Sequence, residues 1–325
     1  MTRLGYQIPN FTYPGVEPAG LFDAVARQAR EADGSGFDTV MVMDHFYQLP
    51  MLGPPEHEML ECYTLLSALA QHTSNVRLSA LVTGNTYRSP TLLAKTLTTL
   101  DVVSGGRAQL GIGAGWFELE HDSLGFEFGT FTERFEKLEE ALQIIRGMFA
   151  GERPSLDGKW YQVSDAINSP APLGKIPIMI GGGGEKKTLR LVAQYADMSN
   201  LICAPGDIPR KLDVLAAHCD ALGRDRSEIV VSYQGQACVA PTHDEAVAEL
   251  DEYFAASGLD LASMSEEAAG RIRGMIVHGS PDELGEHYAK LMETGIDGFT
   301  LSAPVNGFRE GRVELLGQTL SKVVG

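Results

Sequence analysis

The sequence lacks paired cysteines and long apolar runs. Its four cysteines form no CxxC pair and show no disulfide spacing. No segment is long and apolar enough to cross a bilayer, and the first residues, MTRLGYQIPNF, lack the apolar stretch of a signal peptide. These absences predict reduced thiols, a cytoplasmic location and no membrane partner.

Positive charge is also scarce. The chain has 26 Lys and Arg residues against 43 Asp and Glu residues, a formal net charge of −17, which argues against nucleic acid as the main partner. The stretch HEMLE (57–61) is not HExxH, and no His/Cys pair has zinc spacing, so we predict no metal site. No GxSxG elbow supports a serine nucleophile. The expected ligand is a small-molecule substrate.

Short apolar runs alternate with helical patterns along the chain, whose 325 residues are enough for a large α/β core. Several runs are apolar without alternation, as in parallel strands covered on both faces. We expect strands at 4–8, 39–43, 76–83, 108–113, 176–180, 198–202, 229–239 and 298–302, and helices that include 21–33, 91–103, 131–149, 187–195 and 281–293.

Eight strands, each followed by a helix, predict an α/β protein with the (β/α)8 TIM-barrel fold. The alternative is an open doubly wound sheet, split in two. Residues 46–61 and 151–175 interrupt the alternation, and neither has the composition of a flexible linker. We therefore predict one domain over residues 1–325, with loop insertions at the C-terminal face.

Polar and glycine-rich motifs follow four of the predicted strands. Asp44-His45 ends the second strand, TGNTYRSP (83–90) follows the third, GIGAGW (111–116) ends the fourth, and Gly181–Gly184 end the fifth. Barrel enzymes build their active sites from the loops at these strand ends. The recurrence predicts an active site there.

The four glycines are followed by a helix start that carries Glu185, Lys186 and Lys187. A helix N-terminus has free amide donors and partial positive charge, so this order predicts an anion site. Lys186, Lys187 and Arg190 would add positive charge. A P-loop is excluded, because Lys186 stands where GxxxxGK[ST] requires glycine. The alternative is a glycine-lined turn that binds nothing.

Two further motifs have a functional and a structural interpretation. In GIGAGW the glycines at 111, 113 and 115 would leave a shallow floor for a planar ring, with Trp116 at its margin; the alternative is close backbone packing. His45, beside Asp44 at a strand end, changes charge near neutral pH and is a candidate proton-transfer group. The alternative is a structural histidine.

Three stretches, MVMDHFYQLP, LVTGNTYRSPTLLAKTLTTLDVVSGGRAQLGIGAGWFELEH and IPIMIGGGGEKKTLRLVAQYAD, resemble the luciferase-like monooxygenase superfamily. More narrowly, they resemble its coenzyme F420-dependent branch of actinobacterial oxidoreductases, from about residue 4 to residue 235. The resemblance implies a bacterial-luciferase-like barrel, with the cofactor ring at the carboxyl end of the strands and the cofactor phosphate on the glycine-rich loop. Homodimers are common in the superfamily.

The resemblance also implies a function and its residues. The protein would transfer a hydride between F420 and a small organic substrate. His45 would move the accompanying proton, and Asp44 would orient His45 or contact the ring. Phe46, Tyr87 and Trp116 would shape the substrate pocket. A bulge at 80–84, often with a non-prolyl cis peptide in the family, would lie behind the ring. The implied cofactor-binding residues are Ala80, Leu81, Val82, Thr83, Gly84, Asn85, Gly113, Ala114, Gly115, Trp116, Gly181, Gly182, Gly183, Gly184, Glu185 and Lys186.

Two rival functions stay open. One is an FMN-dependent monooxygenase or reductase of the same fold, and the other is a non-catalytic barrel that binds the cofactor. One departure concerns the substrate. In the sugar-phosphate dehydrogenase branch a glutamate follows the GxGxG strand, whereas this chain has Trp116, with Glu118 and Glu120 as the nearest carboxylates. The departure argues against a sugar phosphate.

Overall fold

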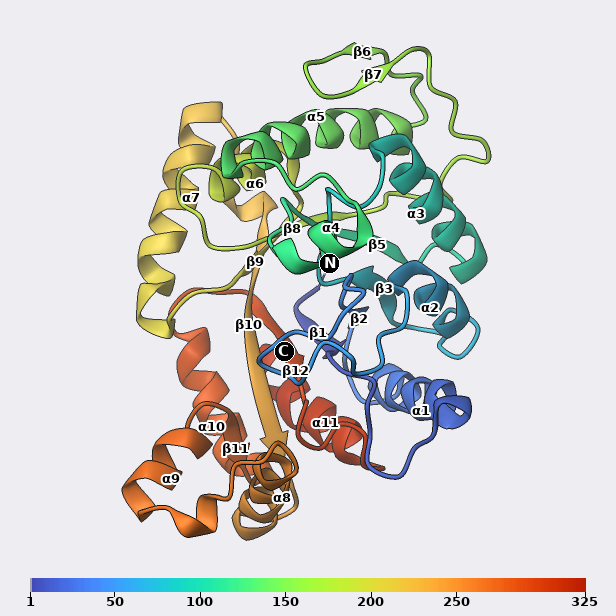
Figure 1. The fold of residues 1–325 in the computed structure, drawn as a ribbon. Coiled ribbons are helices and arrows are strands. Elements are labelled where there is room, and N and C mark those ends of the chain that lie inside the picture. Colours follow the sequence, from blue (N-terminus) through green and yellow to red (C-terminus); the bar gives the residue numbers. More distant parts are fainter. Residues whose placement is uncertain (1) are drawn as a thin grey trace. The chain divides into compact units, whose positions relative to one another are not determined.

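The structure is a computed structural model that describes residues 2–325 (Figure 1). Contacts group the described chain into two compact units. Unit 1 comprises residues 41–46 and 60–231, and unit 2 comprises residues 2–40, 47–59 and 232–325. Two strands, β2 (Thr39–Val42) and β10 (Val230–Val239), each contribute residues to both units. The single domain over 1–325 stays a prediction.

Unit 1 is built on parallel strands. The order within it is β3-β5-β8-β9, and the short β4 also pairs with β5. Registers such as Leu110↔Ile178 and Ile180↔Ser199 place the carboxyl ends of these strands at one edge. The bounds are β3 (Arg77–Ala80), β4 (Thr83–Gly84), β5 (Ala108–Gly113), β8 (Ile178–Gly181) and β9 (Met198–Leu201).

Helices follow these strands, and their ends obey local rules. Ser89 caps one helix by accepting a hydrogen bond from the Leu92 amide, and that helix ends at Gly105, whose φ of 70° suits glycine. Thr130 and Glu133 form a capping box at the start of another. The bounds are α2 (Cys62–Leu69), α3 (Pro90–Ser104), α4 (Glu118–Leu124), α5 (Phe131–Phe149), α6 (Thr188–Tyr195) and α7 (Ile208–Leu222).

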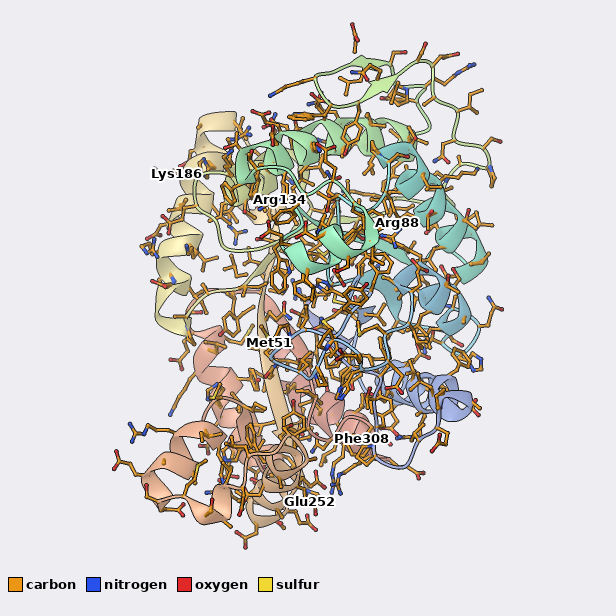
Figure 2. All side chains as sticks on the ribbon, viewed as in Figure 1. Met51, Arg88, Arg134, Lys186, Glu252 and Phe308 are labelled. Carbon is orange, nitrogen blue, oxygen red and sulfur yellow. The ribbon has the colours of Figure 1, made fainter. Side chains whose placement is uncertain are left out.

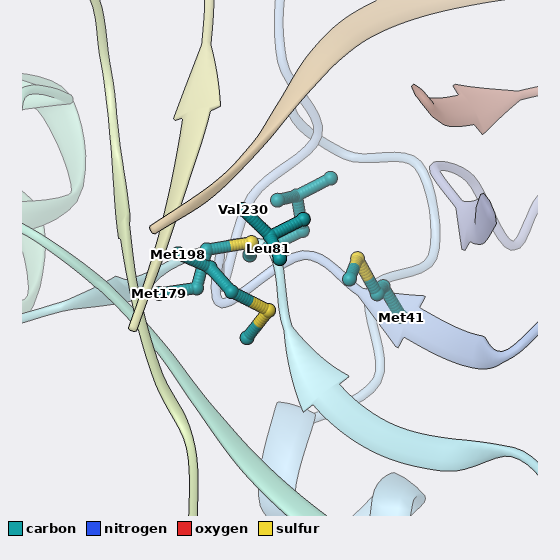
Figure 3. Packing of buried hydrophobic residues seen from close by; sticks show 5 residues of the cluster. All are labelled: Met41, Leu81, Met179, Met198 and Val230. Atoms are coloured by element: carbon teal, nitrogen blue, oxygen red, sulfur yellow. The ribbon is translucent and has the colours of Figure 1, made fainter. Parts of the chain in front are cut away.

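The strands of unit 1 pack around a cluster of buried apolar side chains. Figure 3 shows its centre, where side chains from separate strands and from the segment after β3 come together. Three of the five side chains in this cluster are methionines, whose unbranched side chains fill irregular space. The cluster consists of Met41, Leu81, Met179, Met198 and Val230.

Unit 2 has the strand order β11-β10-β12-β1, again parallel, with registers such as Tyr6↔Leu301 and Tyr233↔Phe299. A second apolar cluster contains Cys238, Leu250 and Ile276. The bounds are β1 (Leu4–Ile8), β11 (Val277–Gly279), β12 (Gly298–Ser302), α1 (Leu21–Asp33), α8 (His243–Ala256), α9 (Glu266–Arg273), α10 (Pro281–Met292) and α11 (Arg312–Val324).

The chain is a (β/α)8 barrel, as its alternation of elements predicts, so the open-sheet alternative is wrong. The run predicted as one strand at 76–83 is two strands, β3 and β4. They are separated by Leu81 and Val82, whose peptide bond is cis. The 151–175 insertion carries a small antiparallel hairpin of β6 (Leu156–Asp157) and β7 (Gln162–Val163). Within residues 2–325, none of the helices has the length and apolar character needed to cross a membrane.

Candidate functional site

Asp44, just after β2, is held by a permanent cation. Its carboxylate accepts two hydrogen bonds from Arg88, at 2.7 Å from Nη1 and 3.0 Å from Nη2, and a third from the Gly84 amide at 3.1 Å. Arg88 also binds Glu61 at 2.7 Å. Burial raises the pKa of Asp44, and the positive charge of Arg88 acts against that rise. We call these four residues the Asp44 cluster.

Glu120, on α4, is the centre of a second cluster. Its side chain is fully buried, and it accepts hydrogen bonds from the Phe46 amide and the Tyr87 hydroxyl. His45 Nδ1 lies 2.9 Å from Glu120 Oε2. Burial, and next the hydrogen bond to Glu120, raise the pKa of Tyr87 well above its ordinary value. We call Glu120, His45, Tyr87 and Phe46 the Glu120 cluster.

This arrangement fixes the tautomer of His45. Glu120 accepts from the Phe46 amide and the Tyr87 hydroxyl, so we infer that His45 Nδ1 donates to it as well and carries a proton. His45 Nε2 makes no hydrogen bond to any residue in the range 2–325. The rings of Trp116 and Phe117 lie edge-on to the imidazole, with centroids 5.8 and 5.7 Å away. One nitrogen is therefore tied, and the other is left for a ligand.

The prediction that Asp44 orients His45 is wrong, because the hydrogen bonds of Asp44 go to Arg88 and Gly84 while His45 bonds to Glu120. Whether Asp44 contacts the ring stays a prediction. The sequence contained a signal for Glu120, since it is one of the two carboxylates closest to Trp116. Only the phase of α4 distinguishes them, burying Glu120 and exposing Glu118.

His121, also on α4, is structural. Its Nδ1 lies 2.8 Å from the Phe117 carbonyl oxygen and its Nε2 lies 2.7 Å from the Thr86 hydroxyl. The side chain is fully buried, and its ring packs against Tyr87 at 4.9 Å between centroids. Both nitrogens have partners, so His121 offers neither to a substrate.

The three residues predicted to shape a substrate pocket fall into two groups. Phe46 and Tyr87 are in edge contact, with centroids 5.2 Å apart. Trp116 lies beside His45 instead, and 55% of it is exposed. Their role in binding substrate stays a prediction.

The glycines of GIGAGW serve close packing. A Cβ at Gly111 would lie 2.1 Å from the Ala80 carbonyl oxygen, and one at Gly115 would lie 2.6 Å from Thr86 Oγ1. Gly115 also has a φ of 82°, which suits glycine. A Cβ at Gly113 would lie 3.0 Å from Val82. The packing interpretation of this motif therefore explains its glycines, and a ring floor stays a prediction.

The loop after β8 presents free backbone donors. The amide of Gly182 bonds to the Asn200 carbonyl oxygen, but the next four amides, at 183–186, make no hydrogen bond within residues 2–325. Gly182 has a φ of 119°, and a Cβ at Gly183 would lie 2.7 Å from the Ile202 carbonyl oxygen. Consecutive free amides before a helix are the donor set that a phosphate takes. We call residues 181–186 the glycine-rich loop.

Some charged side chains around the glycine-rich loop form ion pairs, and others do not. Glu185 is neutralised by Arg210 and by Lys211, the latter at 2.8 Å. Lys186, near the margin of the view in Figure 2, is exposed and has no ion pair within residues 2–325. Arg190, predicted to support an anion, is instead paired with Glu139 at 2.6 Å. The available charge therefore comes first from Lys186, since the ammonium of the neighbouring Lys187 lies over the rings of Phe131 and Phe135.

Asn85 carries an orphaned polar atom. Its side chain is buried, its Nδ2 lies 3.5 Å from the Tyr161 hydroxyl, and its Oδ1 has no hydrogen bond. A buried amide oxygen without a partner is costly, which favours a ligand that brings a donor. An N–H of a flavin or deazaflavin ring is such a donor.

Comparison with known proteins agrees with this geometry. The sequence profile of a family described as luciferase-like monooxygenase matches residues 2–298. The F420-dependent glucose-6-phosphate dehydrogenase of Microbacterium testaceum is 31% identical, covering 81% of this chain and 82% of its own. The 5,10-methylenetetrahydromethanopterin reductase of Methanolobus tindarius is 25% identical, covering 91% and 95%.

Solved structures of similar fold include users of two cofactors. An F420-dependent secondary alcohol dehydrogenase bound to an F420-acetone adduct has a TM-score of 0.77 at 20% identity, covering 100% of this chain and 99% of its own. The oxygenating constituent of 3,6-diketocamphane monooxygenase from Pseudomonas putida, bound to FMN, has a TM-score of 0.76 at 20% identity, covering 99% and 98%. The relatives found by sequence are enzymes, which removes the non-catalytic barrel as an alternative. The chain therefore belongs to the luciferase-like monooxygenase family.

Proposed function

We propose that this enzyme is an F420-dependent oxidoreductase that transfers a hydride between the deazaflavin and a small organic substrate. The F420-dependent relatives support the choice of cofactor. When bound, F420 supplies the hydride chemistry, and the barrel supplies binding, orientation and charge control.

The residues present fit this cofactor in two places. The free amides at 183–186, with Lys186 beside them, would hold its phosphate. The orphaned Asn85 Oδ1 would accept a hydrogen bond from a ring N–H. The remaining cofactor contacts, in the segments 80–84 and 113–116, stay part of the proposal.

The observation that carries the proposal is the His45–Glu120 contact at 2.9 Å. Interconversion of a carbonyl and an alcohol moves one proton at oxygen as well as one hydride at carbon. His45 Nε2 would accept or donate that proton, while Glu120 holds Nδ1 and supports the positive charge that forms on the ring. Trp116 and Phe117 would limit the approach of a substrate to the imidazole.

The second candidate is an FMN-dependent monooxygenase or reductase, favoured by the FMN-bound neighbour of similar fold. The glycine-rich loop would hold an FMN phosphate as well. A parallel titration of the apo protein with F420, FMN and NADPH distinguishes the two. We expect F420 to bind most tightly, and FMN binding more tightly than F420 at every ionic strength would overturn the proposal.

Three further points belong to the proposal. Trp116 stands where the sugar-phosphate dehydrogenases have glutamate, so we do not extend the substrate of the Microbacterium relative to this chain. A homodimer and a cytoplasmic location remain proposals. Sedimentation of the purified protein would test the first, and fractionation of the source cells would test the second.

A further inference from the structure

Unit 2 contains a pocket of about 340 Å³ that shares no residue with the candidate site. Its walls come from the loop after β1, from the 47–59 segment, from the loop after β12 and from α8. The two strand loops follow the carboxyl ends of their strands, the ends from which barrels build their binding sites. The volume lies at the lower end of the range of small-molecule pockets.

The pocket has a preformed aromatic wall. The rings of Tyr13 and Phe308 are stacked, with centroids 5.7 Å apart and an angle of 22° between their planes. Tyr13 cannot swing away freely, because its hydroxyl donates to the Asn10 carbonyl oxygen at 2.6 Å and accepts from Gln28 at 2.9 Å. Phe308, labelled in Figure 2, also lies against the guanidinium of Arg309. A flat ligand would meet an aromatic wall in which Tyr13 is held in place and the Arg309 guanidinium lies beside Phe308.

The charged side chains in the pocket form ion pairs within residues 2–325, although Arg309 Nε is buried there without a hydrogen-bond partner. Arg309 donates to Glu252 at 2.5 Å. Glu249 accepts from Arg312 at 2.7 Å and from Asn306 at 2.7 Å. An ionic ligand would therefore have to compete with existing pairs for its counter-charge. An uncharged ligand would leave those pairs intact.

Two polar side chains that line the pocket are free to bind. Neither the Asn10 amide nor the His57 imidazole makes a hydrogen bond within residues 2–325. His57 stands on the 47–59 segment, which is anchored because the Glu58 amide donates to Thr12 Oγ1 at 3.1 Å. A mostly apolar wall with a few free polar groups is the usual composition of a specific small-molecule site.

We propose that this pocket binds an uncharged, flat aromatic molecule that carries a hydroxyl or carbonyl group. The ring lies against the wall of Tyr13 and Phe308, and the polar group bonds to Asn10 or His57. The proposal uses no residue of unit 1, so its test does not require the cofactor or the proposed proton transfer.

The test compares 2-naphthol with 2-naphthoate, which has nearly the same shape but is an anion at neutral pH. Isothermal titration calorimetry of the full chain should show one 2-naphthol site, with the anion bound at least about tenfold more weakly. Ala256 lines the pocket from α8, and its neighbour Ala255 is exposed and does not. Ala256→Trp should abolish binding of 2-naphthol, whereas Ala255→Trp, the matched control, should leave it unchanged.

A second variant tests the polar contact without filling the pocket. Asn10→Leu should weaken 2-naphthol about threefold to tenfold, the usual effect of losing one hydrogen bond. Circular dichroism checks that each variant is folded. Absence of binding to the wild-type chain, equal affinity for the anion, or unchanged affinity in Ala256→Trp would each overturn the proposal.

Discussion

The two regions of the candidate site in unit 1 differ in whether their polar groups have partners within the protein. In the Asp44 and Glu120 clusters each buried carboxylate has its partners within the protein. In the glycine-rich loop four amides and the side chain of Lys186 have none within residues 2–325. In the first region the buried carboxylates need no ligand, and His45 Nε2 is left open within residues 2–325, so the region is suited to exchanging a proton at that atom. The second needs a ligand to satisfy its donors, so it is suited to binding.

Within the first region, the adjacent residues Asp44 and His45 have partners of different kinds. Asp44 faces Arg88, whose charge is permanent. Burial acts to lower the pKa of the Arg88 guanidinium, but the negative charge of Asp44 raises it, and the net shift is upward. His45 faces Glu120 and has a charge that changes with its proton. We infer that Asp44 secures the chain after β2 and that His45 moves the proton.

The largest expected effect is on turnover. His45→Ala removes the group proposed to move a proton, and we expect turnover with reduced F420 and a carbonyl substrate to fall about 10²–10⁴-fold. Glu120→Gln keeps the size of the side chain but weakens its hold on Nδ1, so its turnover should fall less. Stopped-flow measurement of F420 oxidation gives both rates.

Affinity for the cofactor separates this role from a structural one. It should be largely retained in both variants, because neither residue belongs to the glycine-rich loop. Normal turnover in His45→Ala, or a variant that fails to fold while Glu120→Gln is fully active, would make His45 structural.

The next largest effect is on stability. Arg88→Met leaves the buried Asp44 without its cation, and breaking a buried pair in this way costs about 3–5 kcal/mol in the free energy of unfolding. Burial already raises the pKa of Asp44, and the variant loses the charge that opposes this rise. At Asp44 the folded state of the variant binds a proton still more tightly, relative to the unfolded state, than the wild-type fold does. Stability should therefore fall as pH rises from the unfolded pKa of the aspartate toward its folded pKa.

Urea unfolding at pH 5 and pH 7 checks this prediction, with a larger loss expected at pH 7. The control is the double variant Asp44→Asn with Arg88→Met, in which residue 44 carries no charge that could be left without a cation. It should recover part of the lost stability and show no added pH dependence. A double variant as unstable as the sum of the single variants would contradict the coupling.

The sequence predicts the bounds of the strands better than it predicts which side chains pair with one another. The bounds of β1, β5 and β12 match their apolar runs, because a strand buried on both faces leaves an uninterrupted signal. The partner of His45 lies 75 positions away on α4, and only packing decides which carboxylate of that helix faces inward. The same holds for Arg190, whose charge reads as available in the sequence but is paired with Glu139 across two helices.

The third effect concerns the second region. Gly183→Val places a side chain where a Cβ would already lie 2.7 Å from the Ile202 carbonyl oxygen, so the loop must shift and its amides move. We expect cofactor affinity to fall at least about tenfold, equivalent to about 1.4 kcal/mol. Gly174→Val is the matched control, since a Cβ there meets nothing within 4 Å. A folded Gly183→Val that binds F420 normally would remove this loop from the cofactor site.

The smallest effect tests whether Lys186 and Lys187 favour F420 over FMN. F420 carries an oligoglutamate tail, and a protein of net charge −17 must place local positive charge where that tail leaves it. Lys186 and Lys187 supply this charge, and exposed pairs of this kind are worth about 0–1 kcal/mol each and are screened by salt. F420 affinity should therefore fall moderately as salt rises, and FMN affinity should fall less.

Changing Lys186 and Lys187 together to glutamine should remove that difference. The same change at Lys290 and Lys322, exposed lysines of unit 2, alters net charge equally and should have no effect. An undiminished salt response in the Lys186 and Lys187 variant would place the tail elsewhere.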